Sequence, residues 1–464
     1  MPNSEPGLDF VRAPPSVDNQ AGTSAPLCTP AYRIQPGLAA AIALKKSGHN
    51  VVVLEKDSGL GGSSGEPDGC ARVAANGSKI LLDWDLEAMA LANATFLPSF
   101  WLYKYGPEEA PGSNVLGLHN YEDSLFKEAQ MEGRHMVFRH RSLLRILYEK
   151  LQPQDNTKAG GDADCGPHVS VLFGAEVVNV DCAACAVTLR SGEVHTADAI
   201  IGADGERGIV RRVLMDEENA GPDSATGLAL YSAIVPKALV VQNGIADMFE
   251  DGNLSSIWAG PNRGNRNGVM EGEAEDVNIC LYTPDSSQDG TWKDETEMTI
   301  TDVLGSCDAR IRQLAGLAGP ATCVQIKKPY ELESWVSSSG RVLALGQAAH
   351  PFAPAAFHCY SAALEDGAFI GRIFSHTRDH ARVPEFFHAF QEHREPRCAR
   401  MNGADNVYIQ LMTMPDGVMQ EGRDAGLRAN HAAGRSVLDG DLQDVQDEFI
   451  FVCVEVAAAS IRSN

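Results

Sequence analysis

Gly37 and Glu55 stand eighteen positions apart in the sequence and could together hold a dinucleotide. Gly37 opens a helix-like apolar pattern, GLAAAIALKKSGHN, and Glu55 ends the apolar run VVVLE that follows it. A glycine at the start of such a helix lets helix and strand pack closely. A carboxylate at the end of the second strand can accept hydrogen bonds from both ribose hydroxyls of an adenosine. The pair therefore indicates half of a βαβ unit with a buried parallel strand.

The segment before Gly37 departs from the glycine-rich turn that such a unit normally carries. When the helix starts are aligned, the first two glycines of the GxGxxG fingerprint fall on Tyr32 and Ile34. Those glycines allow a tight turn and the close approach of backbone to pyrophosphate, and Pro36 removes one N–H donor at the same place. The preceding run, PLCTPA at 26–31, has two prolines and is a poor central strand. Three explanations stay open: the loops are rebuilt around an altered site, the site is decaying, or the N-terminal segment is not the biological one.

Alternating helix and strand patterns along the chain predict an α/β protein. After the unit at 37–55, an amphipathic helix is expected at 141–151 and buried strands within 199–205 and 340–350. Between 216 and 334 the pattern changes to separate strands joined by polar loops rich in glycine and asparagine. This change indicates a second, sheet-based domain inserted into the first.

Composition restricts the partners of the chain. Its 464 residues carry a formal net charge of −24, and 44% of them are apolar, which is enough for a sizeable core. Because nucleic acids and anionic membranes attract basic surfaces, neither is expected as a partner. The 11 cysteines follow no framework spacing, so reduced thiols, no metal site and a cytoplasmic setting are expected. Residues 1–25, rich in proline and serine, are expected to be disordered, without a secretory signal.

Two further segments complete an order of motifs that is typical of a known family. GADGERGIVRR at 202–212 and GQAAHP at 346–351 follow the helix–strand unit along the chain. Together the three segments resemble the group A flavoprotein monooxygenases, the family of para-hydroxybenzoate and salicylate hydroxylases. That family carries a GxGxxG unit, a DG segment and a GDAAHP segment in this order. Each motif is weak by itself, but the order, with a strand-rich insertion between the last two, is specific. The resemblance covers residues 31–400.

The resemblance implies a fold and a set of domains. It implies a Rossmann-type FAD-binding domain of the GR2 kind, discontinuous in sequence, with an inserted mixed β-sheet substrate domain and a helical C-terminal part. The two parts of the FAD-binding domain are expected at 26–215 and 335–400. The substrate domain is expected at 216–334, and the helical region at 401–464.

The resemblance also implies cofactor contacts at particular residues. Glu55 would bind the adenosine ribose, and Arg141 would contact the flavin chain. Asp204 and Gly205 match the DG pair, which touches FAD and the reduced nicotinamide, and Gly69 would lie near the isoalloxazine. The remaining expected FAD-binding residues are Gly37, Lys56, Gln347 and Tyr360.

The flavin loop departs from the family pattern at several positions. Gln347 stands where the family has an aspartate that binds the ribityl or pyrophosphate end of FAD. Phe357 and Cys359 stand where glycines normally admit the flavin ring. His350 and His358 lie near the flavin in this alignment and are expected to be structural.

The implied activity is hydroxylation of an aromatic or related electron-rich small molecule. NADPH or NADH would reduce FAD, and the reduced flavin would capture O2 and transfer one oxygen atom to the ring. The substrate pocket is expected between the inserted sheet and the flavin loops, lined from strands around Tyr231, Trp258 and Tyr282. The sequence does not identify the catalytic base. The alternatives are a non-catalytic paralogue that acts as an interaction module, and a flavin enzyme of another type, such as an oxidase or epoxidase.

Overall fold

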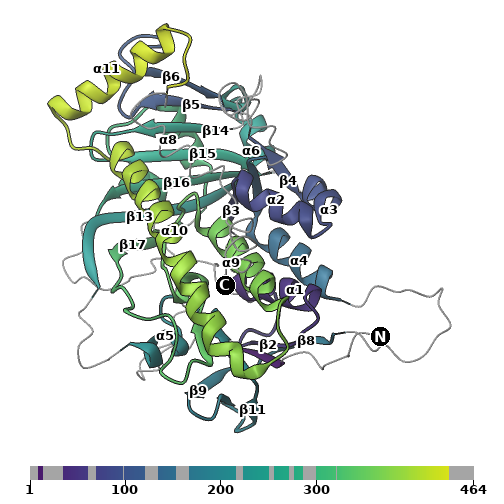
Figure 1. Cartoon of the computed structure of the whole chain (residues 1–464). Helices are drawn as coiled ribbons and strands as arrows, with labels where there is room; N and C mark the ends of the chain where they lie inside the picture. The colour runs from purple at the N-terminus through teal and green to yellow at the C-terminus, as the bar shows by residue number, and fades with distance from the viewer. Residues whose placement is uncertain are drawn as a thin grey trace.

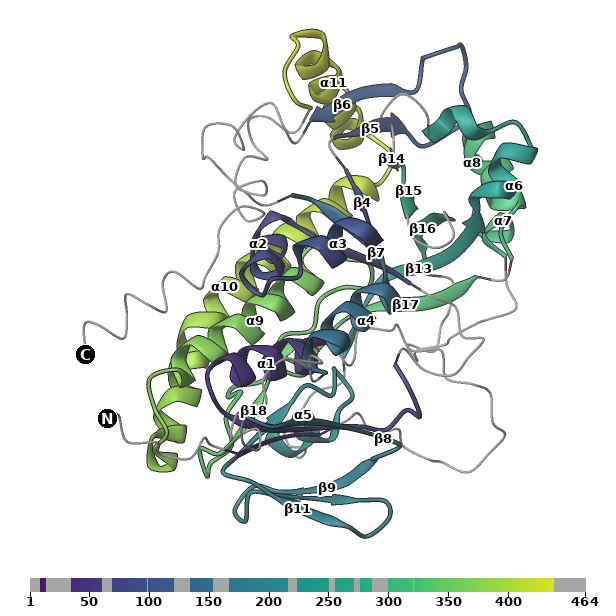
Figure 2. The same ribbon diagram turned by 90° about the vertical axis from the view of Figure 1, so that its right-hand side faces the viewer.

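The computed structural model describes eleven segments of the chain, shown in Figures 1 and 2. They are residues 9–13, 35–60, 69–97, 99–120, 134–152, 167–215, 223–249, 255–270, 276–285, 299–319 and 321–437. Two large sheets organise these segments, and long helices pack against both. In Figure 1 the larger sheet lies above the smaller one, and α10 runs along the side of both.

The first sheet is the parallel sheet of the nucleotide-binding half. Its strand order is β18-β12-β1-β2-β8, and all four neighbouring pairs are parallel. The strands are β1 (Asp9–Ala13), β2 (Asn50–Glu55), β8 (Val169–Phe173), β12 (Ala199–Gly202) and β18 (Val342–Ala344). Along β2 the faces alternate. Val51 and Val53 pack with helices α1 (Gln35–Lys46), α4 (His140–Leu151) and α9 (Cys359–Phe374), whereas Leu54 packs with the opposite layer. A sheet covered on both faces explains the continuous apolar run VVVL.

The opposite layer is a small antiparallel sheet with a short helix. Its strands are β9 (Val177–Asp181), β10 (Ala186–Leu189) and β11 (Val194–Thr196), in the order β11-β10-β9. They lie below the parallel sheet in Figure 2, and α5 (Ile209–Leu214) packs in the same cluster. Buried Cys185 belongs to this cluster, and burial raises its pKa to about 11. Cys182, which is half-buried, packs against the same cluster.

The first strand corrects a prediction from the sequence. Residues 1–25 are not disordered throughout, because Asp9–Ala13 forms β1, the middle strand of the parallel sheet. Phe10 pairs with Val51 on one side and with Ala199 on the other. A central strand needs an N–H at every paired position, and DFVRA contains no proline, unlike PLCTPA. Residues 26–31, Tyr32 and Ile34 lie outside the described residues.

The second sheet is larger and mixed. Its order is β17-β13-β16-β15-β14-β5-β6, antiparallel except for the parallel pair β14–β5. The strands are β5 (Ser99–Lys104), β6 (Val115–Asn120), β13 (Ser224–Pro236), β14 (Ser255–Ala259), β15 (Gly264–Met270), β16 (Asp276–Pro284) and β17 (Thr322–Lys328). This sheet does not follow the domain boundaries expected from the sequence. β5 and β6 come from within 26–215 and yet extend the sheet that was assigned to 216–334.

Different helices and loops pack on the two faces of the second sheet. One face packs on α7 (Ile300–Val303) and α8 (Ala309–Gly316), with α6 (Lys237–Gln242) and the 3-10 turn η1 (Ala246–Phe249) nearby. The other face packs on the end of α10 (Val383–Met412) and on the loop around Phe357, and α11 (Val418–Ala432) covers β6. Because α10 contributes buried residues to both this cluster and the core of the first sheet, it joins the two halves.

Small elements bridge the two sheets. A three-stranded sheet, β3-β7-β4, is formed by β3 (Cys70–Val73), β7 (Met136–Arg139) and β4 (Ala94–Phe96). Helices α2 (Ala75–Asp83) and α3 (Glu87–Asn93) follow its first strand. The turns η2 (Gly346–Ala348) and η3 (His380–Arg382) flank α9. None of the described helices combines the length and apolar character that a membrane crossing requires.

Close packing of α1 on α9 fixes the start of α1. A Cβ built on Gly367 would lie 2.6 Å from the carbonyl carbon of Ala39, and one on Gly371 would lie 2.4 Å from the Cβ of Ala43. Glycine on one helix facing alanine on the other lets the two backbones approach directly. The N-terminus of α1 is thereby held beside the N-terminal part of α9 and the loop before it.

Candidate active site

Three segments meet at the N-terminus of α1, where a dinucleotide phosphate is expected. The side-chain amide of Gln35 donates to the carbonyl of Tyr360, with a distance of 3.2 Å. Gly346 has φ +63°, and a Cβ there would lie 2.7 Å from Cγ of Pro36. The first turn of α1, the η2 turn and the start of α9 therefore form one surface.

The residues predicted to hold the adenosine end of FAD lie at the end of β2 and in the first turn of α1. Glu55 is only 4% exposed at the end of β2, and one of its carboxylate oxygens accepts a hydrogen bond from the backbone of Asp57 at 3.2 Å. Lys56 follows it, half-buried. The first turn of α1 has no acidic residue, and Gly37 adds no side chain to it. A buried acceptor and a helix start without negative charge are features that suit a ribose and a phosphate, and their contact with FAD stays a prediction.

Asp204 and Gly205 form the turn that follows β12. Asp204 is fully buried, and its Oδ2 accepts a hydrogen bond from the backbone N–H of Val210 at 2.8 Å. Gly205 has φ +83°, a conformation that favours glycine, and a Cβ on Gly208 would collide with the Asp204 carboxylate. The DG pair thus sets the entry into α5. Its contact with FAD stays a prediction.

Gln347 has a role inside its own loop. Its side-chain oxygen accepts a hydrogen bond from the backbone N–H of Phe352 at 2.7 Å. An aspartate is one methylene shorter and would not span the loop in the same way. The substitution is therefore accompanied by a local adaptation of the 346–352 turn.

The flavin-side residues are also brought together. The hydroxyl of Tyr360 is hydrogen-bonded to Nδ1 of His140 at 3.0 Å, and the backbone N–H of His140 donates to the carbonyl of Gly69 at 2.7 Å. Arg141 follows at the start of α4, half-buried. Burial, assisted by the charge of Arg141, lowers the pKa of His140 to about 3, so the imidazole is neutral. His140 was missed in the sequence because a histidine beside the expected arginine carries no spacing signal.

The loop at 357–360 is pinned from α10. Asp405 accepts hydrogen bonds from the backbone N–H groups of Phe357 and His358, both at 3.1 Å. Its Oδ1 lies 2.9 Å from Nδ1 of His358, and both side chains are buried. These bonds hold the loop although Phe357 and Cys359 replace glycines. The signal available in the sequence was an acidic residue on the apolar face of a long helix.

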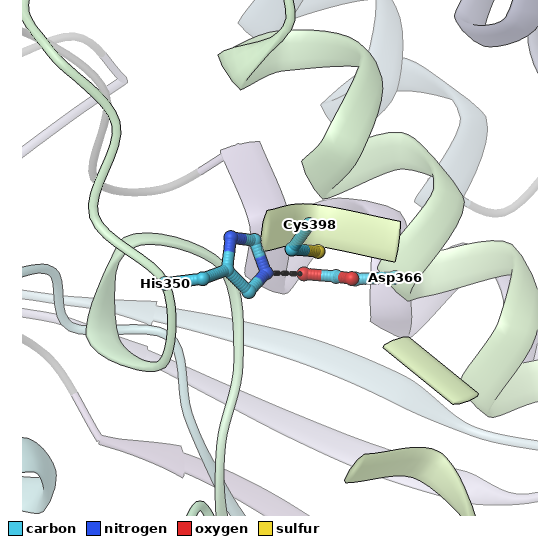
Figure 3. Close-up of side chains that lie close together, drawn as sticks. All are labelled: His350, Asp366 and Cys398. Carbon is cyan, nitrogen blue, oxygen red and sulfur yellow. Dashed lines mark hydrogen bonds and ion pairs between the residues drawn. The ribbon is translucent and has the colours of Figure 1, made fainter. Parts of the chain in front are cut away.

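A buried ionic network holds the neighbouring turn at Gly346, and Figure 3 shows its pair of His350 and Asp366. Asp366 accepts from the backbone N–H of Gly346 at 3.0 Å and pairs with His350 at 2.6 Å and Arg394 at 2.8 Å. Arg394 also pairs with Glu365 at 2.6 Å, and these two side chains are fully buried. Burial opposes protonation of His350, but the charge of Asp366 outweighs it and raises the pKa to about 10.

Three side chains of the network also have the donor types of a metal site. The ligand atoms of His350, Asp366 and Cys398 lie within 4.8 Å of one another (Figure 3). Asp366 also pairs with Arg394 and accepts a hydrogen bond from the backbone N–H of Gly346, so these contacts hold the start of the η2 turn.

A small cavity lies between the flavin loop and the second sheet. Its volume, about 10 Å³, is about the least that can hold one water molecule. Its walls come from β3, β15, β16, the loop 355–357 and α10, and include Arg72, Arg266, Cys280, Tyr282, Ala355, Ala356, Phe357, Asp405, Tyr408, Ile409 and Met412. This is the predicted location of the substrate pocket.

Only one of the three aromatic residues expected in this pocket reaches it. Tyr282 lines the cavity, whereas Tyr231 and Trp258 pack under α7 and α8 on the other face. The register explains the error, because Tyr231 pairs with Leu281 and therefore lies on the face opposite to Tyr282.

Comparisons with known proteins agree with this architecture. Residues 36–93 match the family model of the NAD(P)-binding Rossmann-like domain. The chain is 22% identical over 393 residues to the FAD-dependent monooxygenase OpS4 of Beauveria bassiana, covering 84% of this chain and 86% of that protein. It is 26% identical over 396 residues to hispidin-3-hydroxylase of Neonothopanus nambi, covering 78% and 83%.

Solved structures share the fold across the whole chain. FqzB superposes with a TM-score of 0.70 at 17% identity, covering 100% of this chain and 95% of that one. A salicylate hydroxylase substrate complex gives 0.66 at 16% identity, covering 96% and 98%. In its motif order, its fold and these relatives, the chain is similar to the group A FAD-dependent aromatic monooxygenases.

Proposed function

We propose that the protein hydroxylates an aromatic or related electron-rich small molecule with NAD(P)H and O2, using FAD. The observation that carries the proposal is the cavity at Tyr282, which lies between the substrate sheet and the loop at 352–360 of the nucleotide-binding half. A flavin hydroxylase needs a substrate cavity that lies directly beside the flavin. The relatives are named FAD-dependent monooxygenases and hydroxylases, which supports the reaction class.

FAD, when bound, supplies the reduction by NAD(P)H and the activation of O2, and the protein supplies binding and shielding. Glu55 would accept hydrogen bonds from the ribose. Gly37 and the start of α1 would receive the pyrophosphate, and Arg141 would hold the flavin chain. On the substrate side, Phe357, Ile409 and Met412 give the cavity an apolar wall that would help to shield the reaction from water.

The deciding experiment is a flavin and turnover assay of the purified protein. We expect a flavin spectrum after purification or after incubation with FAD, and NAD(P)H oxidation that rises with an aromatic compound and yields a hydroxylated product. NAD(P)H oxidation that forms only hydrogen peroxide with every aromatic compound would identify an oxidase. A protein that takes up no FAD would contradict the proposal and favour a non-catalytic paralogue.

The cellular setting belongs to the same proposal. We propose a cytoplasmic protein with no nucleic-acid partner. The eight cysteines within the described residues all carry free thiols, which is typical of a reducing compartment. The net charge of −24 disfavours a polyanionic partner.

A further inference from the structure

Helix α11 exposes an apolar face and buries polar residues. It lies beside β6 at the edge of the second sheet (Figures 1 and 2), and on that side Gln420, Asp424 and Leu427 are buried. On the opposite side Val418 is 83% and Met419 is 75% exposed. A surface helix of a globular protein normally has the reverse pattern. The outer side of α11 therefore has the composition of a contact surface.

This apolar face continues along the whole helix. Its exposed residues, which we call the outer face, recur at alternate spacings of three and four: Met419, Gly422, Gly426, Ala429 and Ala433. A Cβ built on Gly422 or on Gly426 would have nothing within 4 Å. Positions with this spacing lie on one side of a helix, and small residues there admit the side chains of a second helix.

The chain continues beyond the described residues with a segment of matching spacing. Val437, the last described residue, is buried, and its N–H donates to the carbonyl of Leu118 in β6 at 3.3 Å. Its own carbonyl accepts from the side-chain amide of Asn430 at 3.4 Å, so the chain leaves α11 beside its C-terminal end. Residues 438–441, LDGD, have the composition of a turn. Large apolar residues then recur at alternate spacings of three and four: Leu442, Val445, Phe449, Val452 and Val456.

We propose that residues 442–456 of the same chain bind to the outer face of α11 as an antiparallel helix. In this register Phe449 lies over Gly426 and Val452 lies over Gly422, so large side chains meet positions that have none. The contact removes apolar surface of both partners from water. A second copy of α11 would bring mostly small side chains to the same positions and would bury less. The inference does not depend on the proposed function.

Charges on the two partners are complementary in the same register. Arg428 and Arg435 are exposed along one side of the outer face. Arg428 donates to two backbone carbonyls, each at 3.2 Å, and these carry no charge. In the proposed pairing Glu448 lies opposite Arg428, and Asp441 lies opposite Arg435. Residues 438–456 contain no lysine or arginine, so the segment brings negative charge to a positive edge.

Native Cys453 allows the register to be tested by one substitution. In the proposed pairing it lies beside Gly422, within the separation of Cα atoms that a disulfide allows. The full chain with Gly422→Cys should form an intrachain disulfide with Cys453 under mild oxidation. Non-reducing electrophoresis and mass spectrometry of peptides identify the product. Ala433→Cys, on the same face about three turns away, is the matched control and should yield at least fivefold less of its disulfide with Cys453.

Gly426→Leu tests the contact itself. On a face that stays open to water, leucine in place of glycine favours the helix and raises the unfolding temperature. Under Phe449 the leucine leaves no room for the ring. The unfolding temperature of the full chain should therefore fall, and the Gly422→Cys disulfide should form at least fivefold less. Adding Phe449→Ala should restore the disulfide.

Three results would overturn the proposal. They are a higher unfolding temperature for Gly426→Leu, equal disulfide yields at positions 422 and 433, and no disulfide at either position. A disulfide between two chains at Gly422→Cys would also overturn it, and would identify a second copy of the chain as the occupant of the outer face.

Discussion

Glu55 is a single buried carboxylate on which cofactor retention is expected to depend. Glu55→Gln keeps the size of the side chain and removes its charge. Hydrogen bonds to a charged group contribute about 1.5–3 kcal/mol, so FAD binding should weaken at least about tenfold. The measurement is flavin titration of the apoprotein, with Glu392→Gln at an exposed position of α10 as the control. Equal affinity in parent and mutant would show that Glu55 does not bind the ribose.

Gln347→Asp is expected to change two properties of the protein, its affinity for FAD and its stability. Gln347→Asp offers FAD a charged acceptor and should tighten binding a few-fold, because charge-assisted hydrogen bonds are stronger. It also removes the bond from the Phe352 N–H, so the free energy of unfolding of the apoprotein should fall by about 1 kcal/mol. Flavin titration and denaturant unfolding measure the two effects independently. Weaker FAD binding would mean that the loop has been rebuilt around glutamine.

At the scale of elements, the contact between α1 and α9 depends on glycine. Gly371→Ala places a methyl group 2.4 Å from the Cβ of Ala43, so the helices must separate. Overpacking of this kind costs about 1–3 kcal/mol. Gly403→Ala, in α10 with nothing within 4 Å, is the matched control and should be neutral or slightly stabilising. Denaturant unfolding of both variants checks the contrast. A Gly371→Ala protein as stable as the parent would contradict the close contact.

The packing of α9 on α10 should also give stability a pH dependence. The pKa of His350 is about 10 in the folded protein, above its ordinary value near 6.5. A raised folded pKa contributes stability that is complete below pH 6.5 and is lost as the pH rises through about 10. The neighbouring Asp366 has a lowered pKa, because the charges of His350 and Arg394 outweigh its burial. Its contribution is lost in acid instead.

His350→Gln tests this dependence by removing the titrating group. The variant should be less stable than the parent at pH 6.5, and the difference should shrink steadily towards pH 10. Unfolding free energies of both proteins at four pH values in this interval provide the comparison. A difference that stays constant with pH would mean that His350 is neutral throughout.

At the scale of the whole molecule, the parallel sheet depends on residues far from its other strands in sequence. Val11 lies in β1 between Val52 and Ile200. Val11→Pro removes an N–H from a central strand and should cost about 2 kcal/mol or more, with loss of FAD uptake. Val11→Thr keeps the N–H and a β-branched side chain, and is the control. If both variants are as stable as the parent, residues 9–13 do not supply the central strand.

The sequence by itself determined the local units and their order. The helix at 35–46 and the strand at 50–55 follow from apolar spacing and from Gly37, because these patterns depend on neighbours a few residues apart. Asp204 with Gly205 and the turn at 346 were indicated by short motifs that resemble those of the family. Their order along the chain was enough to indicate the family.

Only the tertiary structure decided the pairings between distant segments. It placed β1 at 9–13 and joined β5 to β14, because a strand gains its partners from the sheet and not from its own residues. In the structure Tyr231 faces away from the cavity, because a change of one position in a strand moves a side chain to the opposite face. It also brought Arg72 and Arg266 from two separate strands to one wall. No spacing along the chain encodes that meeting, because it depends on how two sheets pack.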